Sequence, residues 1–163
     1  MKKGSICIGD TGAIISLAII DKLSLLDLFF DKIFVPQAVW SELVEDESFA
    51  EVENIKFFFR DRVKKIHSVN DLKLIMDRGE SEAVLLYQEL EADVLLIDDR
   101  KAREIAESLG VNCLGTLALL ITAKENQLIE SLNIIFSQFL ANRRFYSKQL
   151  LNSILRDHNE QVL

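Results

Sequence analysis

The chain has 163 residues, of which 49% are hydrophobic and 28% are charged, a composition typical of a soluble globular protein with its own core. Its 26 acidic and 19 basic residues give a formal net charge of −7, which argues against a general polyanion-binding surface but not against a local basic rim. The chain shows neither a long apolar run nor a signal-peptide pattern, so we expect a cytoplasmic protein without a membrane span. Cys7 and Cys113 fall in expected strands, where they resemble small buried hydrophobes rather than a disulfide or metal pair.

Strands and helices alternate along the chain. Strands are expected at residues 5–9, 32–35, 63–67, 93–97 and 111–114. Helices are expected at about residues 13–20, 21–31, 37–43, 51–61, 80–91, 100–109, 116–126, 130–142 and 148–158, with a helical turn over 71–76 that Asp77, Arg78 and Gly79 end. Such alternation predicts an α/β fold with a mainly parallel sheet and right-handed crossovers. We expect a single domain over residues 1–163, in which about 128–163 form a C-terminal helical extension.

The stretch from Val94 to Arg103 is the most informative part of the sequence. Four apolar residues predict a buried strand, Asp98 and Asp99 end it, and an apolar stripe that begins at Ala102 predicts a helix directly after it. Asp99 stands where a helix N-cap is needed, and this local role is sufficient to explain it. The carboxyl end of a central strand is also where α/β proteins place ligands, so a functional role stays open.

Other carboxylates belong to the same edge of the expected sheet. Asp10 ends the first strand, and Glu42 lies on the helix after the second strand, at a position that points along its inward face. Glu80 and Glu82 lie at the start of the helix before the fourth strand, on opposite borders of its apolar stripe, so periodicity does not choose between them. Each residue has a local alternative: Asp10 as a helix cap, Glu42 as an ordinary helical glutamate, and the other two as first-turn acids favoured by the helix dipole.

Several carboxylates in one cleft repel each other. At ~5 Å and an effective dielectric constant of ~20, each pair of like charges costs roughly 3 kcal/mol, so such a site needs protons or a cation. Oxygen ligands without His or Cys favour Mg²⁺ or Mn²⁺ over Zn²⁺. The sequence therefore predicts a divalent-metal site suited to phosphoryl chemistry, with these candidate ligands: Asp10, Glu42, Glu80, Glu82, Asp98 and Asp99.

At this point the chain resembles the PIN domain, a family of metal-dependent ribonucleases that includes the VapC-type toxins of bacteria and archaea. The pattern is most similar to a poorly characterised prokaryotic branch of PIN-like proteins and covers nearly the whole chain. The matching pieces are Ile8-Gly9-Asp10-Thr11-Gly12, Val35-Pro36 with Glu42, Gly79-Glu80-Ser81-Glu82-Ala83, Leu96-Ile97-Asp98-Asp99-Arg100-Lys101-Ala102-Arg103, Leu114-Gly115-Thr116-Leu117, and the tail with Arg144-Phe145-Tyr146 and Ile154-Leu155.

The resemblance implies a Rossmann-like three-layer α/β/α sandwich with a parallel sheet of order 3-2-1-4-5. It also implies hydrolysis of RNA phosphodiester bonds with Mg²⁺ or Mn²⁺, and it matches Asp10, Glu42, Glu82 and Asp99 to the four catalytic acids. Two positions depart from the family pattern: Glu82 replaces the usual Asp, and Ile97 stands where Thr or Ser is frequent.

The resemblance further suggests partners. It implies an RNA substrate, a homodimer and, for a toxin, a small antitoxin protein. Candidate contacts to substrate phosphates are Arg100, Lys101, Arg103 and Lys124, for each of which a solvated helix face is an equally good explanation.

An acidic pocket in an α/β fold has three alternative explanations to a PIN-type nuclease. A haloacid-dehalogenase-like phosphatase needs a second Asp two residues after the first, where this chain has Gly12, and a receiver domain needs an Asp after the third strand, where His67-Ser68-Val69 supplies none. Both are disfavoured. A non-catalytic PIN-like module for protein interaction or nucleic-acid binding stays open because Glu82 departs from the pattern and the surface is acidic.

Overall fold

The computed structural model describes residues 4–163, and in this part of the chain five strands pair into one parallel sheet of order β3-β2-β1-β4-β5. The strands are β1 (Ile6–Gly9), β2 (Lys32–Pro36), β3 (Val63–Lys64), β4 (Val94–Leu96) and β5 (Cys113–Leu114). The strand order that the resemblance implied is thus confirmed. Cys7 of β1 pairs with both Ile33 of β2 and Val94 of β4, so β1 is the central strand.

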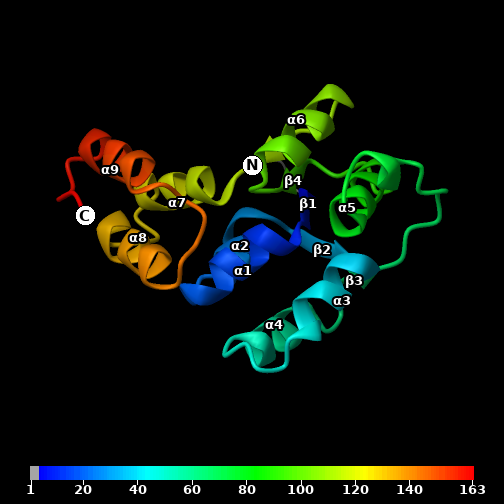
Figure 1. The fold of residues 1–163 in the computed structure, drawn as a ribbon, viewed down its shortest axis with the longest axis horizontal. Coiled ribbons are helices and arrows are strands. Elements are labelled where there is room, and N and C mark those ends of the chain that lie inside the picture. Colours follow the sequence, from blue (N-terminus) through cyan, green and yellow to red (C-terminus); the bar gives the residue numbers. More distant parts are fainter. Residues whose placement is uncertain (1–3) are drawn as a thin grey trace.

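Helices follow the strands in the expected alternation (Figure 1). They are α1 (Thr11–Ile19), α2 (Leu25–Phe29), α3 (Gln37–Glu45), α4 (Val52–Phe59), α5 (Arg78–Glu89), α6 (Arg100–Ser108), α7 (Thr116–Glu125), α8 (Leu132–Ala141) and α9 (Lys148–Asp157), with a short 3₁₀ turn, η1 (Leu72–Leu74). Figure 1 shows α8 and α9 gathered beside α7, on the left of the view. Within residues 4–163, no helix combines the length and the apolar character needed to cross a membrane.

The two faces of the sheet are covered by different helices. Successive strand side chains point to opposite faces, so Cys7 and Ile8 of β1 enter different apolar clusters. The cluster around Cys7 includes buried residues of α1, α3, α4, α7, α8 and α9, and the cluster around Ile8 includes those of α5 and α6. The three-layer α/β/α sandwich is therefore confirmed. Because each fully buried aliphatic side chain contributes roughly 1.5–3 kcal/mol, the two clusters hold the layers together.

Several expected boundaries are wrong. The predicted helix over 21–31 is reduced to α2, since Asp21 adopts a left-handed φ of 52° that ends α1 in a turn. The predicted strand over 63–67 has only two residues in β3. Helix α5 begins at Arg78, so Arg78 and Gly79 are helical rather than a break, because Asp77 and Glu80 form a capping box at this end.

The C-terminal extension packs on the sandwich rather than extending from it. Helix α8 contacts α1 and α7, and α9 packs on α8. The carboxylate of Glu160, beyond α9, accepts hydrogen bonds from the backbone N–H groups of Leu132 (3.0 Å) and Asn133 (2.8 Å), which lie in the first turn of α8. This contact joins the segment after α9 to the start of α8.

Candidate active site

Acidic side chains gather at the carboxyl edge of the sheet. A cavity of about 1060 Å³ there is lined by six acids from four segments of the chain: Asp10, Glu42, Asp77, Glu80, Asp98 and Asp99. We call it the acidic cleft. It lies beside the carboxyl ends of the adjacent strands β1 and β4, as expected for a ligand site at the point where the strand order of an open parallel sheet reverses.

Asp10 is the most buried acid of the cleft, with 5% of its surface exposed. It directly follows β1, where its N–H donates to the carbonyl of Leu96 (3.0 Å), and its carboxylate caps α1 by accepting from the N–H of Gly12 (3.3 Å). Burial, together with the negative charges of Glu80 and Glu42, raises the pKa of Asp10 to about 7, although the backbone hydrogen bonds oppose this change. Asp10 is therefore the helix cap that the sequence allowed, and it is also a carboxyl group whose ionised form is disfavoured.

Glu42 borders the cleft from α3. Its side chain is exposed, so the expectation that it points along the inward face is wrong: the residues of α3 that pack inward are Ala38, Val39 and Leu43. The hydroxyl of Thr11 donates to its carboxylate, and that carboxylate lies against Gly79 of α5. A Cβ atom on Gly79 would stand 2.6 Å from Oε1 of Glu42, so the absence of a side chain at Gly79 makes room for the carboxylate.

The structure separates Glu80 from Glu82. Glu80 lines the cleft, and burial, with Asp77, Asp99 and Glu42 nearby, raises its pKa although the N–H of Asp77 opposes this. Glu82 is buried outside the residues that line the cleft, and its carboxylate accepts from the N–H of Ala38 (3.0 Å) and from Nε of Arg78 (3.1 Å). Of the two candidates, Glu80 is thus the one that lines the cleft.

Asp98 and Asp99 also differ. The Asp98 carboxylate accepts from the N–H and the hydroxyl of Thr116 (2.8 Å each) and from the hydroxyl of Tyr146 (2.5 Å), so it ties α7 and the C-terminal segment to the end of β4. Asp99 caps α6 through the N–H of Ala102 (2.8 Å) with Oδ1 alone. Within residues 4–163, Oδ2 of Asp99 has no hydrogen-bond donor, which leaves this oxygen for a ligand.

The four candidate basic residues are scattered. Arg100 lines the acidic cleft while it pairs with Glu104 (2.9 Å), whereas Lys101 lines the neighbouring groove. Arg103 is half-buried and donates to the carbonyl of Ile97 (2.7 Å). Lys124 contacts Glu160 (3.1 Å) near the end of the chain. Of these, only Arg100 lies among the residues that line the cleft.

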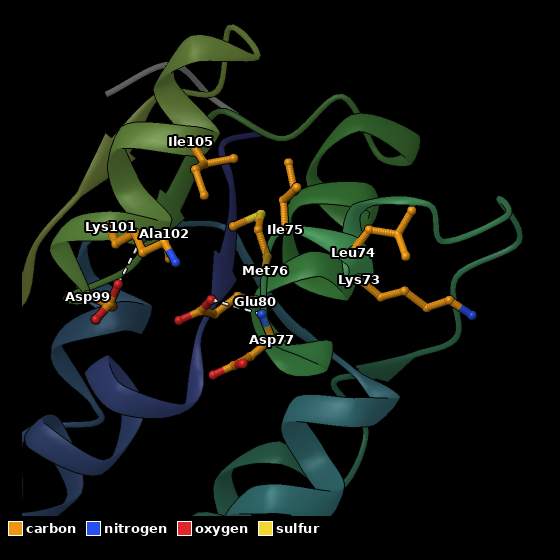
Figure 2. Close-up of a pocket in the computed structure, with 10 residues that line it drawn as sticks. All are labelled: Lys73, Leu74, Ile75, Met76, Asp77, Glu80, Asp99, Lys101, Ala102 and Ile105. Carbon is orange, nitrogen blue, oxygen red and sulfur yellow. Dashed lines mark hydrogen bonds between the residues drawn. The ribbon is translucent and has the colours of Figure 1, made fainter.

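A second groove of about 800 Å³ adjoins the acidic cleft and shares Asp77, Glu80 and Asp99 with it. Figure 2 shows these three carboxylates at one end of the groove, whereas the side chains of Met76 and Ile105 lie at the other. The three shared acids therefore border two adjoining hollows.

The donor chemistry of the cleft fits a hard divalent cation. Carboxylate oxygens come from Asp10, Glu42, Glu80 and Asp99, without His or Cys, and such sets prefer Mg²⁺ or Mn²⁺. Burial first, and then the charges of Glu80 and Glu42, raise the pKa of Asp10, so its ionised form would gain from a nearby cation. Within the part of the chain that the structure describes, no three acidic, His or Cys side chains are already drawn together tightly enough to hold an ion.

Several residues that line the cleft were not among the predicted site residues, among them Thr11, Asp77 and Arg144. The pattern of Asp77 followed three residues later by Glu80 is a capping-box signature and was a usable signal for the true start of α5. Thr11 directly follows Asp10 at the end of β1, and this adjacency was a usable signal. For Arg144 the local pattern gives no place in the cleft, because its contact with Gly12 joins segments 132 residues apart.

The fold and the site together define a class: a Rossmann-like α/β/α protein with a cluster of acids at the carboxyl edge of the sheet. A family model described as PIN domain matches residues 6–160, and the chain belongs to the PIN domain family. PIN domains are typically nucleases and usually use divalent metal ions, so membership supports a nuclease-type role.

Comparison with solved structures finds a PilT N-terminus domain protein, SSO1118, from the hyperthermophilic archaeon Sulfolobus solfataricus P2. It is 21% identical, covers 72% of this chain and 92% of its own, and superposes with a TM-score of 0.48. No curated protein matches the sequence.

The pKa of Asp10 predicts how the stability of the metal-free protein depends on pH. Its folded value of about 7 exceeds the ordinary 3.8, so the folded state holds the proton more tightly and the free energy of unfolding falls as pH rises between these values. In this window the loss is about 1.4 kcal/mol per pH unit. Asp10→Asn keeps the cap without the charge and should melt higher than wild type at about pH 8, with a smaller difference at about pH 5.

Thermal unfolding in chelator measures this, with Asp71→Asn, at an exposed turn outside the cleft, as the control. Parallel pH profiles for wild type and Asp10→Asn would contradict the prediction.

Substitutions of Glu80 and Glu82 test whether Glu80 binds metal and whether Glu82 has a structural role. Glu80→Gln retains the capping box but removes a disfavoured cleft charge, so we expect a melting temperature in chelator equal to or above that of the wild type and an affinity for Mn²⁺ weakened by about tenfold or more. Glu82→Gln weakens the contacts with Ala38 and Arg78 and should cost about 1–3 kcal/mol of stability while the affinity for Mn²⁺ changes little. Calorimetric titration with Mn²⁺ and thermal melts test both, and the opposite pattern would restore the family assignment of Glu82.

Gly79→Ala should affect metal binding without harming the fold. Alanine favours a helix over glycine by about 1 kcal/mol, but its Cβ would displace the carboxylate of Glu42. We expect equal or higher stability and weaker binding of Mn²⁺. The wild type is the reference for both measurements. Equal Mn²⁺ affinities for Gly79→Ala and the wild type would refute a role for Glu42.

Proposed function

We propose that this protein is a metal-dependent ribonuclease, which hydrolyses RNA phosphodiester bonds with Mg²⁺ or Mn²⁺ bound in the acidic cleft. The observation that carries the proposal is the convergence of Asp10, Glu42, Glu80 and Asp99 on one cleft, where burial and like charges raise the pKa of Asp10 to about 7. The preference for RNA follows from the ribonucleases of the family that the sequence resembles.

Each acid has a distinct part in this proposal. Asp10, anchored at the end of β1 and in the first turn of α1, would be the buried ligand, and Asp99 would present its unbonded Oδ2 from the head of α6. Glu80 and Glu42 would complete the site, with the hydroxyl of Thr11 orienting Glu42. A bound Mg²⁺ or Mn²⁺ ion would activate water and stabilise the leaving oxygen.

The net charge of −7 fits this arrangement, because bound metal and nearby cations, not the whole surface, would attract the phosphate. Arg100 and Arg144 line the same cleft as the acids. The toxin role, the small antitoxin protein and the homodimer stay predictions from the resemblance.

A second function keeps the fold without catalysis, as a PIN-like module for protein interaction or nucleic-acid binding. The observation that favours it is that, among residues 4–163, no three potential ligands are gathered closely enough to hold an ion. Metal binding and RNA cleavage by the wild type distinguish the two functions.

Cleavage of a mixed-sequence RNA is the decisive assay. Wild type should cleave it with Mg²⁺ or Mn²⁺ and should lose activity in chelator. Asp10→Asn and Asp99→Asn should lower the rate by about 100-fold or more, because a ligand that holds the catalytic ion contributes several kcal/mol. Asn is as good an N-cap as Asp, so both helices are retained and lost activity reports on the charge.

Asp46→Asn is the matched control, since Asp46 also bonds a local N–H, that of Ser48 (3.0 Å), but does not line the cleft. It should cleave as the wild type does. Folded wild-type protein that binds neither Mg²⁺ nor Mn²⁺ would refute the enzymatic proposal, and binding of metal without cleavage of any RNA would support the non-catalytic one.

A further inference from the structure

The connection between α8 and α9 supplies part of the acidic cleft. Arg144, Phe145 and Tyr146 line it, although they lie far along the chain from Asp10. Nη2 of Arg144 donates to the carbonyl of Gly12 (2.8 Å) and to the hydroxyl of Ser16 (2.9 Å), and Nε donates to the same hydroxyl (3.1 Å). Gly12 and Ser16 belong to α1, the helix that Asp10 caps, so this segment is held in a defined place relative to the buried acid.

Phe145 is exposed at this position although both of its neighbours are anchored. It has 91% of its surface exposed, whereas Arg144 is bonded to α1 and Tyr146 donates to Asp98 (2.5 Å). The exposure of the ring is therefore not that of a loose chain end. Contact of a phenylalanine ring with water is unfavourable, and here the exposed ring stands at the border of the acidic cleft. The guanidinium of Arg144 lies 5.2 Å from the ring centroid, so a cation accompanies the ring.

We propose that Phe145 is a stacking platform for one base of a single-stranded RNA that occupies the acidic cleft. The inference rests on the proposed function and adds a specificity-determining residue to it. Every base presents a π-face to an aromatic ring, whereas the bases of a duplex are already stacked and paired. Phe145 therefore selects unpaired RNA, and Arg144 adds positive charge beside the stacked nucleotide.

The surroundings of Phe145 favour RNA over a protein partner. A stable protein interface buries ≈ 800 Å² on each side around an apolar centre, whereas the one other exposed large apolar residue that lines the described cleft is Leu150, and the neighbours of Phe145 in the chain include Arg143, Arg144 and Ser147. The chain as a whole repels polyanions, so affinity for RNA has to come from local contacts such as a stack, which does not depend on net charge.

Binding of fluorescent RNA tests the proposal. Anisotropy is measured in Mg²⁺ on the Asp10→Asn background, which prevents cleavage, with an unstructured RNA of about 12 nucleotides and a blunt duplex of the same sequence. Phe145→Ala should weaken single-strand binding by roughly 5- to 100-fold and leave the weaker duplex binding unchanged. Phe145→Trp should restore single-strand binding. Thermal melts should be the same for all variants, since the ring is exposed.

Phe57→Ala is the matched control. Phe57 on α4 is also exposed, at 73%, and the guanidinium of Arg60 lies 5.2 Å from its ring centroid, but it does not line the cleft. It should bind RNA within about twofold of the background protein. Equal affinities for Phe145→Ala and Phe57→Ala would overturn the inference, as would an equal loss of duplex binding. A changed elution volume for Phe145→Ala with unchanged RNA affinity would assign the ring to a contact between copies and overturn it too.

The two proposals fail separately. Wild-type protein that cleaves RNA, together with a Phe145→Ala variant of unchanged single-strand affinity, overturns only the stacking role. Protein that binds single strands through Phe145 but cleaves no RNA with either metal overturns only the ribonuclease.

Discussion

Negative charge held at one edge of the sheet is the constraint on which the rest of the site depends. Asp10 cannot move away from the other acids, because its N–H is bonded to Leu96 of β4 and its carboxylate caps α1. Burial and the charges of Glu80 and Glu42 make its ionised form costly, which the pKa of about 7 expresses. A carboxylate in this place is therefore stabilised by a proton or by a nearby positive charge.

The acids at this edge of the sheet differ in how many hydrogen bonds they accept from the rest of the chain. Asp98 is occupied by Thr116 and Tyr146, and Glu82 by Ala38 and Arg78, so each of these carboxylates is satisfied by donors of the chain. Such bonded acids join elements: β4 to α7 and the C-terminal segment in one case, α5 to α3 in the other. The acids of the cleft accept fewer such bonds: Asp99 accepts one from the N–H of Ala102, and Glu42 one from the hydroxyl of Thr11. The number of donors around each carboxylate therefore differs along the edge of the sheet, although the residue types are the same.

Much of the fold was predictable because it depends on local periodicity, that is, on the spacing of apolar residues within short stretches of the chain. The strand–helix order and the parallel sheet follow from apolar runs and stripes that short windows of sequence contain, whereas the three layers and the strand order were implied by the resemblance to the PIN domain. Element ends were less predictable, since they depend on distant donors and acceptors. The strand expected over 63–67 ends early, where the N–H groups of His67 and Ser68 bond the carboxylate of Glu89 on α5 (2.8 and 2.7 Å) instead of a neighbouring strand.

The sequence by itself determined that acids end β1 and β4, and the topology of a parallel sheet brings those ends to one edge. Only the tertiary structure decided which acids reach the cleft. Glu80 rather than Glu82 faces it because α5 starts at Arg78, and Ala38, on another helix, binds Glu82. The tail joins the site through contacts such as that between Ser16 and Tyr146, 130 residues apart (3.1 Å). Side-chain direction and long-range contacts are set by packing between elements, and no local pattern encodes them.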